Sequence, residues 1–415
     1  NEIDINWLGF KTNASYKSLA FVWYKQLTMK IMDEPNNYSK QKIEEIYNKY
    51  SEISRNINQS RANNISNQTV IFILSESFFN PLRIPGTEIS NDILNNISEI
   101  SLNSTSGTMK SDGYGGGTAN MEFQALTGLP YYNFSSSVTT IYTEVVPEMT
   151  SIPSISDNFS KENRFVLHPS DANNYDRKDI YEKLDFSSLI FQFNSEKSFE
   201  NIKTQGISIS DETVYNNVLL ELDSEKSQFF SIITMQNHAP WSEEYPKELT
   251  AINSNLSDEE NEKLTNYVRL LSYTDVATAN FIRSLEEVEK DITVVFYGDH
   301  LPGFYPQHIF NESPEIQYQT DYFIWSNFET NSKSNNNFIN SSDFIASLFE
   351  TTNSKVSPYY ALLTEVMNHA TINKINLTKA EQIIADDLKL IQYDITIGDG
   401  YIFEFEDFFN IKSED

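Results

Sequence analysis

The chain has 415 residues, of which 39% are hydrophobic and 13% aromatic, so it can bury a core and global disorder is excluded. Its formal net charge of -29 argues against a nucleic-acid partner, because polyanions repel each other, but suits bound metal cations. There is no cysteine, which excludes disulfides, thiolate metal sites and cysteine nucleophiles.

The first segment, residues 1–65, is predicted to be a helical lead-in arm and linker. Apolar side chains recur at helical spacing within residues 40–50, and a polar stretch rich in Asn, Ser and Arg follows to Asn67. A surface helix on the main domain is the equally weighted alternative. No apolar run is long enough to span a bilayer, and the chain begins at Asn1 without methionine. We therefore expect the arm to come from a membrane region that precedes it.

Four continuous apolar runs predict buried strands at residues 70–74, 229–235, 292–297 and 322–326. Strands buried on both faces have such runs, and these are typical of a mostly parallel sheet. Helical segments such as residues 264–289 lie between them, which predicts an α/β fold with a mixed, mostly parallel central sheet flanked by helices. We assign residues 66–335 to this main domain and residues 336–415 to a smaller C-terminal α+β subdomain.

Polar side chains follow three of these runs at the point where each run ends. Glu76 follows the first, Asn237 and His238 follow the second, and Asp299 and His300 follow the third. Open α/β sheets bind their ligands at the carboxyl ends of the strands. The pattern therefore predicts a functional site at this edge of the sheet.

Four of the thirteen glycines fall within residues 113–117, directly before Thr118. The next residues predict a helix that is capped by Thr118 and ends at Gly128. One interpretation is a threonine cap after a flexible loop. The other is a hydroxyl presented at a helix amino terminus, where the dipole and free N–H groups favour phosphate. A neutral threonine is a poor nucleophile and needs a base or a metal.

Residues from these segments could together bind one metal ion. Glu76, Asp299 and His300 offer oxygen and imidazole donors at the ends of separate strands, and with Thr118 they would make a four-ligand site for Mn²⁺, Mg²⁺ or Zn²⁺. Taken singly, each has a plain structural explanation, such as a solvated strand end or a turn.

The motifs together resemble the extracellular catalytic domain of lipoteichoic acid synthases. They are carried, in this order, by residues 75–79, 115–123, 234–240 and 297–302. More broadly, they resemble phosphoglycerol transferases of the alkaline phosphatase/sulfatase superfamily, from about Trp7 to Tyr401. The glycine triplet is similar to a branch that decorates surface polysaccharides such as streptococcal rhamnans.

The resemblance implies a sulfatase-like fold and a role for each matched residue. Glu76, Thr118, Asp299 and His300 would hold one divalent metal, usually Mn²⁺ in this family, and Thr118 would be the catalytic nucleophile. His238 would bind the phosphoglycerol group.

The resemblance also implies a substrate-binding segment at residues 168–177. His168, Tyr175 and Arg177 match its histidine, its aromatic residue and its arginine, although the aromatic is usually tryptophan in lipoteichoic acid synthases. We expect Arg177 to bind phosphate as a fork of donors. His168 and His238 could each contact phosphoglycerol or protonate the leaving oxygen, and Trp241 either lines the pocket or packs.

The implied reaction moves glycerol phosphate from phosphatidylglycerol through a phosphothreonine to an acceptor. The acceptor is glycerol phosphate or a sugar of a glycopolymer, either lipoteichoic acid or a surface polysaccharide. We expect the extracellular face of the membrane of a Gram-positive-type bacterium. Because the acidic domain would repel anionic lipid, a preceding membrane segment is expected to deliver it there.

Two other functions remain open. A sulfatase or phosphodiesterase of the same superfamily is the first, but there is no Cys/Ser-x-Pro-x-Arg motif, and five histidines leave little for a second metal. A non-catalytic surface-binding domain is the second, and the intact metal-ligand set argues against it.

Overall fold

The computed structural model describes residues 18–20, 23–24, 29–242, 244–331, 337–371 and 376–411. Residues 1–17 of the expected lead-in arm therefore lie outside the described residues. In the part of the chain that is described, no helix has both the length and the apolar character needed to cross a membrane.

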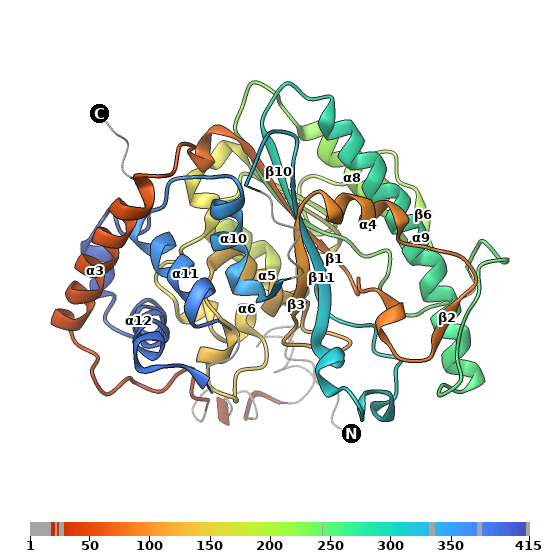
Figure 1. Ribbon diagram of the computed structural model, residues 1–415, viewed down its shortest axis with the longest axis horizontal. Helices are drawn as coiled ribbons and strands as arrows, with labels where there is room; N and C mark the ends of the chain where they lie inside the picture. Colours follow the sequence, from red (N-terminus) through yellow and green to blue (C-terminus); the bar gives the residue numbers. More distant parts are fainter. Residues whose placement is uncertain are drawn as a thin grey trace.

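An eight-stranded sheet runs through the middle of the molecule in the order β12-β3-β11-β10-β1-β8-β4-β5 (Figure 1). Its strands are β1 (Thr69–Ser75), β3 (Thr105–Lys110), β4 (Arg164–Asp171), β5 (Ser188–Phe193), β8 (Phe229–Ile233), β10 (Ile292–Gly298), β11 (Gln319–Ser326) and β12 (Asn337–Asn340). Neighbouring strands are parallel except where β11 pairs with β10 and β3. The predicted mixed, mostly parallel sheet is confirmed.

Helices cover both faces of the sheet. Alternate residues of β1 point to opposite faces, and they enter two separate hydrophobic cores: Phe72 lies in one and Ile71 in the other. The Phe72 core is covered by α3 (Lys40–Asn58), α5 (Thr118–Thr127), α6 (Ile141–Glu144), α7 (Arg177–Lys183), α10 (Phe344–Thr351), α11 (Pro358–His369) and α12 (Lys379–Thr396). The Ile71 core is covered by α4 (Asn95–Leu102), α8 (Asp211–Glu221) and α9 (Asp258–Glu286).

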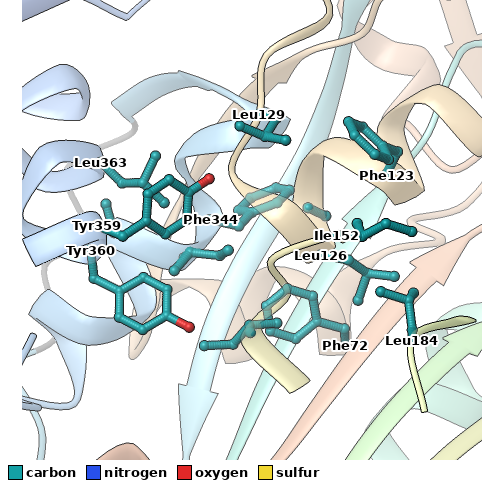
Figure 2. Close-up of a cluster of buried hydrophobic side chains, with 14 of the residues drawn as sticks. Phe72, Phe123, Leu126, Leu129, Ile152, Leu184, Phe344, Tyr359, Tyr360 and Leu363 are labelled. Atoms are coloured by element: carbon teal, nitrogen blue, oxygen red, sulfur yellow. The ribbon is translucent and has the colours of Figure 1, made fainter. Parts of the chain in front are cut away.

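The core on the Phe72 face is rich in aromatic residues (Figure 2). Phe123 and Leu126 of α5 cluster with Phe72 of the sheet and with side chains of α10 and α11, which include Phe344 and Tyr359. Every residue of α5 is buried. This helix is therefore held rigidly between the sheet and the outer helices, and its first residue is held with it.

The segments outside residues 66–335 pack onto the same body. Helix α3 buries Ile43, Ile46 and Tyr50 in the Phe72 core, as expected of a surface helix on the main domain. Strand β12, within the expected C-terminal subdomain, pairs with β3 in the central sheet. The division into three domains stays a prediction.

Among the residues that the structure describes, four short strands lie outside the central sheet. They form two ribbons: β2 (Thr87–Ile89) with β9 (Ala251–Asn253), and β6 (Thr204–Gln205) with β7 (Ser208–Ile209). Helix α9 begins before the predicted residue 264, because Ser257 and Glu260 form a capping box at its start.

Candidate metal and phosphoglycerol site

The register of the central strands brings the predicted ligands together. Ser75 at the end of β1 pairs with Gly298 at the end of β10, so Glu76 and Asp299 leave the sheet side by side. Gly298 is required here, because a Cβ atom on it would lie 1.8 Å from the carbonyl oxygen of Phe78. The glycine of the Gly-Asp-His segment thus permits the close approach of two backbones beside the site.

Glu76, Asp299 and His300 form a buried cluster. One ligand atom from each lies within 4.8 Å of the others. Nε2 of His300 is 3.3 Å from Oδ2 of Asp299 and 3.5 Å from Oε1 of Glu76. The convergence of three residues from two separate strands is as the sequence predicts.

Asp299 and His300 are each oriented by hydrogen bonds to one side-chain atom, which leaves the other atom directed into the cluster. Oδ1 of Asp299 accepts the backbone N–H groups of Ser77 and His300, at 2.8 and 2.9 Å, whereas the buried Oδ2 has no hydrogen-bond partner. Nδ1 of His300 lies 2.9 Å from the carbonyl oxygen of Leu301, which fixes the proton on Nδ1 and turns Nε2 into the cluster. A buried acceptor without a partner beside a free imidazole nitrogen fits a cation.

The electrostatics of the cluster also favour a bound cation. Burial, and then the neighbouring Glu76 carboxylate, raise the pKa of Asp299 to about 6. Burial opposes a charge on His300, but Asp299 and Glu76 outweigh it and raise the pKa of this imidazole. Two carboxylates crowded into a buried space lack positive charge, and a divalent cation would supply it.

Thr118 lies at the start of α5, beside this cluster. Its side chain interacts with Asp299 and lines the same cavity as Glu76 and His300. The cap residue is Gly117 and not Thr118, so the predicted cap position is wrong by one residue. Gly115, Gly116 and Gly117 all have positive φ angles, of 62°, 158° and 93°, a backbone path that side chains disfavour. The glycines therefore let the loop turn sharply and present the threonine at the helix amino terminus.

His168, Tyr175 and Arg177 also come together at this site. Nδ1 of His168 is 3.1 Å from the carbonyl oxygen of Ile233, and its Nε2 is 3.3 Å from Nη1 of Arg177. The guanidinium carbon of Arg177 lies 4.8 Å from the centre of the Tyr175 ring. Burial, and then Arg177, hold the pKa of His168 well below its usual range, so this imidazole is neutral.

Glu122 holds Arg177 in place, a contact that the sequence did not reveal. It accepts hydrogen bonds from Nε and Nη2 of Arg177, at 3.0 and 2.8 Å, and from the Tyr181 hydroxyl at 2.7 Å. Both partners of the ion pair are buried, with side chains only 1–2% exposed. Nε and Nη2 of Arg177 therefore bind Glu122 and are not available to a phosphate. Of its nitrogens, only Nη1 lies toward His168. An acidic residue one turn after Thr118 was the available signal.

His238 is exposed, and its Nδ1 lies 2.6 Å from the carbonyl oxygen of Ala239. Trp241 both lines the cavity and packs, since its ring meets Phe304 edge-on at 5.1 Å.

A cavity of about 780 Å³ is lined by most of these groups. Its lining includes Glu76, Thr118 and His300 of the cluster, as well as His168, Tyr175, Arg177, His238 and Trp241. The eight predicted site residues thus line this cavity or, in the case of Asp299, contact residues that do. The roles predicted for them stay predictions.

The sheet and its edge cluster define a sulfatase-like fold. Residues 68–354 match the sulfatase family, which is more than half of the chain, and the chain belongs to that family. The Streptococcus pyogenes phosphoglycerol transferase GacH, solved in complex with sn-glycerol-1-phosphate, is 51% identical, with a TM-score of 0.90. The match covers 92% of this chain and all of that one.

Two further relatives are more distant. The lipoteichoic acid synthase LtaP from Listeria monocytogenes shares the fold, with 17% identity and a TM-score of 0.54 over 85% of this chain and 98% of that chain. A Rhizobium meliloti protein named for cyclic beta-1,2-glucan modification is 25% identical over 83% of this chain and 57% of its own length. The chain thus spans little more than half of that curated relative. The predicted membership among lipoteichoic acid synthase-like phosphotransferases, and the predicted sulfatase/alkaline phosphatase-like fold, are confirmed.

Proposed function

We propose that this chain is a metal-dependent phosphoglycerol transferase that carries glycerol phosphate on Thr118. The donor is phosphatidylglycerol and the acceptor is a cell-surface glycopolymer. The observation that carries the proposal is the partnerless Oδ2 of Asp299, which faces His300 beside the Thr118 hydroxyl. The 51% identity to a phosphoglycerol transferase bound to glycerol phosphate supports the substrate class.

The metal ligands in this proposal are Glu76, Asp299, His300 and Thr118. Hard oxygen donors with a single imidazole suit Mn²⁺ first and Mg²⁺ or Zn²⁺ next. When bound, the cation would supply Lewis-acid polarisation of the phosphate and lower the pKa of the threonine hydroxyl.

The first half-reaction is an in-line displacement at phosphorus. The Thr118 oxygen forms a bond to phosphorus as the bond from phosphorus to the diacylglycerol oxygen breaks. The threonine hydroxyl loses one proton and the diacylglycerol oxygen takes one up, so the step balances. The amino terminus of α5, where Thr118 lies, favours the negative charge of the phosphate.

Proton transfer to the leaving oxygen is assigned to His238. His168 is neutral, its Nδ1 proton is committed to the carbonyl oxygen of Ile233, and its Nε2 accepts from Arg177. It has no proton to give at the cavity and instead accepts a hydrogen bond there. His238 is exposed and lines the same cavity, with Nδ1 engaged by Ala239 and Nε2 open to the substrate.

The glycopolymer acceptor places the reaction at the cell surface. We assign the domain to the extracellular face of the membrane of a Gram-positive-type bacterium, reached through a membrane segment ahead of residue 1. The Streptococcus pyogenes relative supports this bacterial class. Lipoteichoic acid and a surface polysaccharide are the two acceptor classes considered.

The test is release of diacylglycerol from fluorescent phosphatidylglycerol in detergent micelles with Mn²⁺. We expect release with the wild-type protein and with Thr250→Ala, a matched change at an exposed threonine outside the cavity, and none with Thr118→Ala or with EDTA. Turnover that resists EDTA, or that persists in Thr118→Ala, would contradict the proposal. Release of free glycerol phosphate at the same rate with and without acceptor would indicate a hydrolase.

A further inference from the structure

The cavity has two walls that rest on opposite faces of the sheet. Tyr175, beside Arg177, packs against the core that contains Phe72. Tyr114 and Trp241 pack against the other core, which contains Ile71 and Phe304. Because Phe72 and Ile71 point to opposite faces of β1, the metal cluster at the sheet edge lies between the two walls. We name the Tyr114 and Trp241 side the aromatic wall.

Both rings of the aromatic wall are held in place by their polar atoms. Nε1 of Trp241 donates to the carbonyl oxygen of Asn237 at 2.9 Å, and the Tyr114 hydroxyl donates to the carbonyl oxygen of Tyr305 at 2.5 Å. The Tyr114 ring also meets Phe310 edge-on at 5.6 Å. Since the polar atoms are already satisfied within the protein, the rings offer carbon surface to the cavity. Little conformational freedom remains to be lost on binding.

Glycines leave free space in the cavity beside the aromatic wall. A Cβ atom on Gly116 would meet nothing within 4 Å, whereas one on Gly115 would lie 2.8 Å from Cα of Gly303. The backbones of Gly115 and Gly303 thus touch, and Gly116 borders free space next to Thr118. A volume of about 780 Å³ is in the range that holds a drug-sized ligand and exceeds the needs of one phosphoglycerol group.

We propose that the aromatic wall is the acceptor subsite and that it binds a pyranose ring of the glycopolymer, stacked on Trp241. This rests on the proposed function. The C–H face of a pyranose carries partial positive charge, which meets the negative face of an aromatic ring. None of Tyr114, Gly115, Gly116, Trp241 and Gly303 is cationic. The wall therefore offers no cationic side chain to the phosphates of a polyglycerol phosphate acceptor.

The subsite completes the second half-reaction. A sugar hydroxyl presented from this wall forms a bond to phosphorus as the bond from phosphorus to the Thr118 oxygen breaks. The sugar hydroxyl gives up its proton and the threonine oxygen regains one, so the enzyme returns to its starting state.

The experiment compares two readouts in the same variants. The first is the burst of diacylglycerol from phosphatidylglycerol without acceptor. The second is transfer to the cell-wall polysaccharide of the source bacterium, stripped of glycerol phosphate, or to polyglycerol phosphate. For Trp241→Ala we expect the ratio of transfer to burst to fall about tenfold, through a higher KM for the polysaccharide. Trp241→Phe keeps a ring and should stay within about threefold of wild type. Tyr114→Leu tests the same wall independently of Trp241.

Each outcome decides the matter. If burst and transfer fall in parallel, the aromatic wall serves lipid binding or the stability of the fold. If transfer is unchanged in both Trp241→Ala and Tyr114→Leu, the wall has no role in the reaction. Either result overturns the acceptor subsite, as does a wild-type preference for polyglycerol phosphate. A wild-type protein with no burst at all would instead overturn the proposed function.

Discussion

The hydroxyl of Ser77 donates a hydrogen bond of 2.8 Å to Oε1 of Glu76. The backbone N–H of the same residue donates to Oδ1 of Asp299 at 2.8 Å, and its carbonyl oxygen accepts from the Tyr267 hydroxyl at 2.6 Å. Ser77 is buried and has a positive φ of 51°, a left-handed conformation that serine adopts at a cost. One strained residue thus ties together two predicted metal ligands.

Ser77 is therefore predicted to be a positioning residue for the metal. Ser77→Ala removes the hydroxyl and keeps the strain, whereas Ser77→Gly removes the hydroxyl and relieves it. Both should weaken Mn²⁺ binding about tenfold in titration calorimetry, but only Ser77→Ala should lose thermal stability. If Ser77→Gly binds Mn²⁺ as tightly as wild type, the hydroxyl has no role at the site and only the turn matters.

The buried pair of Glu122 and Arg177 predicts a large loss of stability when one charge is removed. Glu122→Gln keeps the shape of the side chain but leaves the buried Arg177 cation without a counter-charge, so the free energy of unfolding should fall by about 3 kcal/mol. Urea unfolding measures this change. Glu212→Gln, which breaks an exposed ion pair with Lys203, is the matched control and should cost under about 0.5 kcal/mol. Equal losses in both variants would show that Arg177 does not depend on Glu122.

His168 predicts a dependence of stability on pH. Because burial holds its folded-state pKa well below the unfolded value, the unfolded chain binds a proton below about pH 6.5 that the folded chain does not. The free energy of unfolding is therefore at its full value above about pH 6.5, where the ring is neutral in both states, and it decreases as the pH falls. Relative to His168→Gln, the wild type should lose about 1.4 kcal/mol per pH unit below about pH 6.

The measurement is urea unfolding of both proteins between pH 5 and pH 8. The control is His308→Gln, which changes an exposed histidine and leaves the buried ring of His168 in place. A His168→Gln protein with the wild-type slope would mean that the ring takes up a proton in the folded state.

The sheet and the cluster of Glu76, Asp299 and His300 were predictable because their signals are local. The apolar runs at β1, β8 and β10 are long and buried on both faces, and each is followed by polar residues at the carboxyl end of the strand. The Gly-Asp-His segment is also local, since Gly298 must lack a side chain where the Phe78 carbonyl approaches. Because the strands were predicted to be parallel, we could also predict that their carboxyl ends lie at one edge of the sheet.

The partners of the site residues were not predictable, because they depend on contacts between distant segments. Glu122 faces inward from α5 and meets Arg177, which is 55 residues away, and this contact redirects the arginine fork. Likewise, Trp241 could be assigned either to packing or to the cavity, and the structure shows that it does both. The pattern of a single segment does not contain such pairings.

The central claim is that Thr118 carries the phosphoglycerol group. The direct measurement is intact-protein and peptide mass spectrometry after brief incubation with phosphatidylglycerol and Mn²⁺, without acceptor. We predict a glycerophosphate adduct on the peptide that contains Thr118, its absence in Thr118→Ala, and its loss when the acceptor polysaccharide is added. Diacylglycerol release without any adduct on Thr118, or an adduct on another residue, would contradict the account.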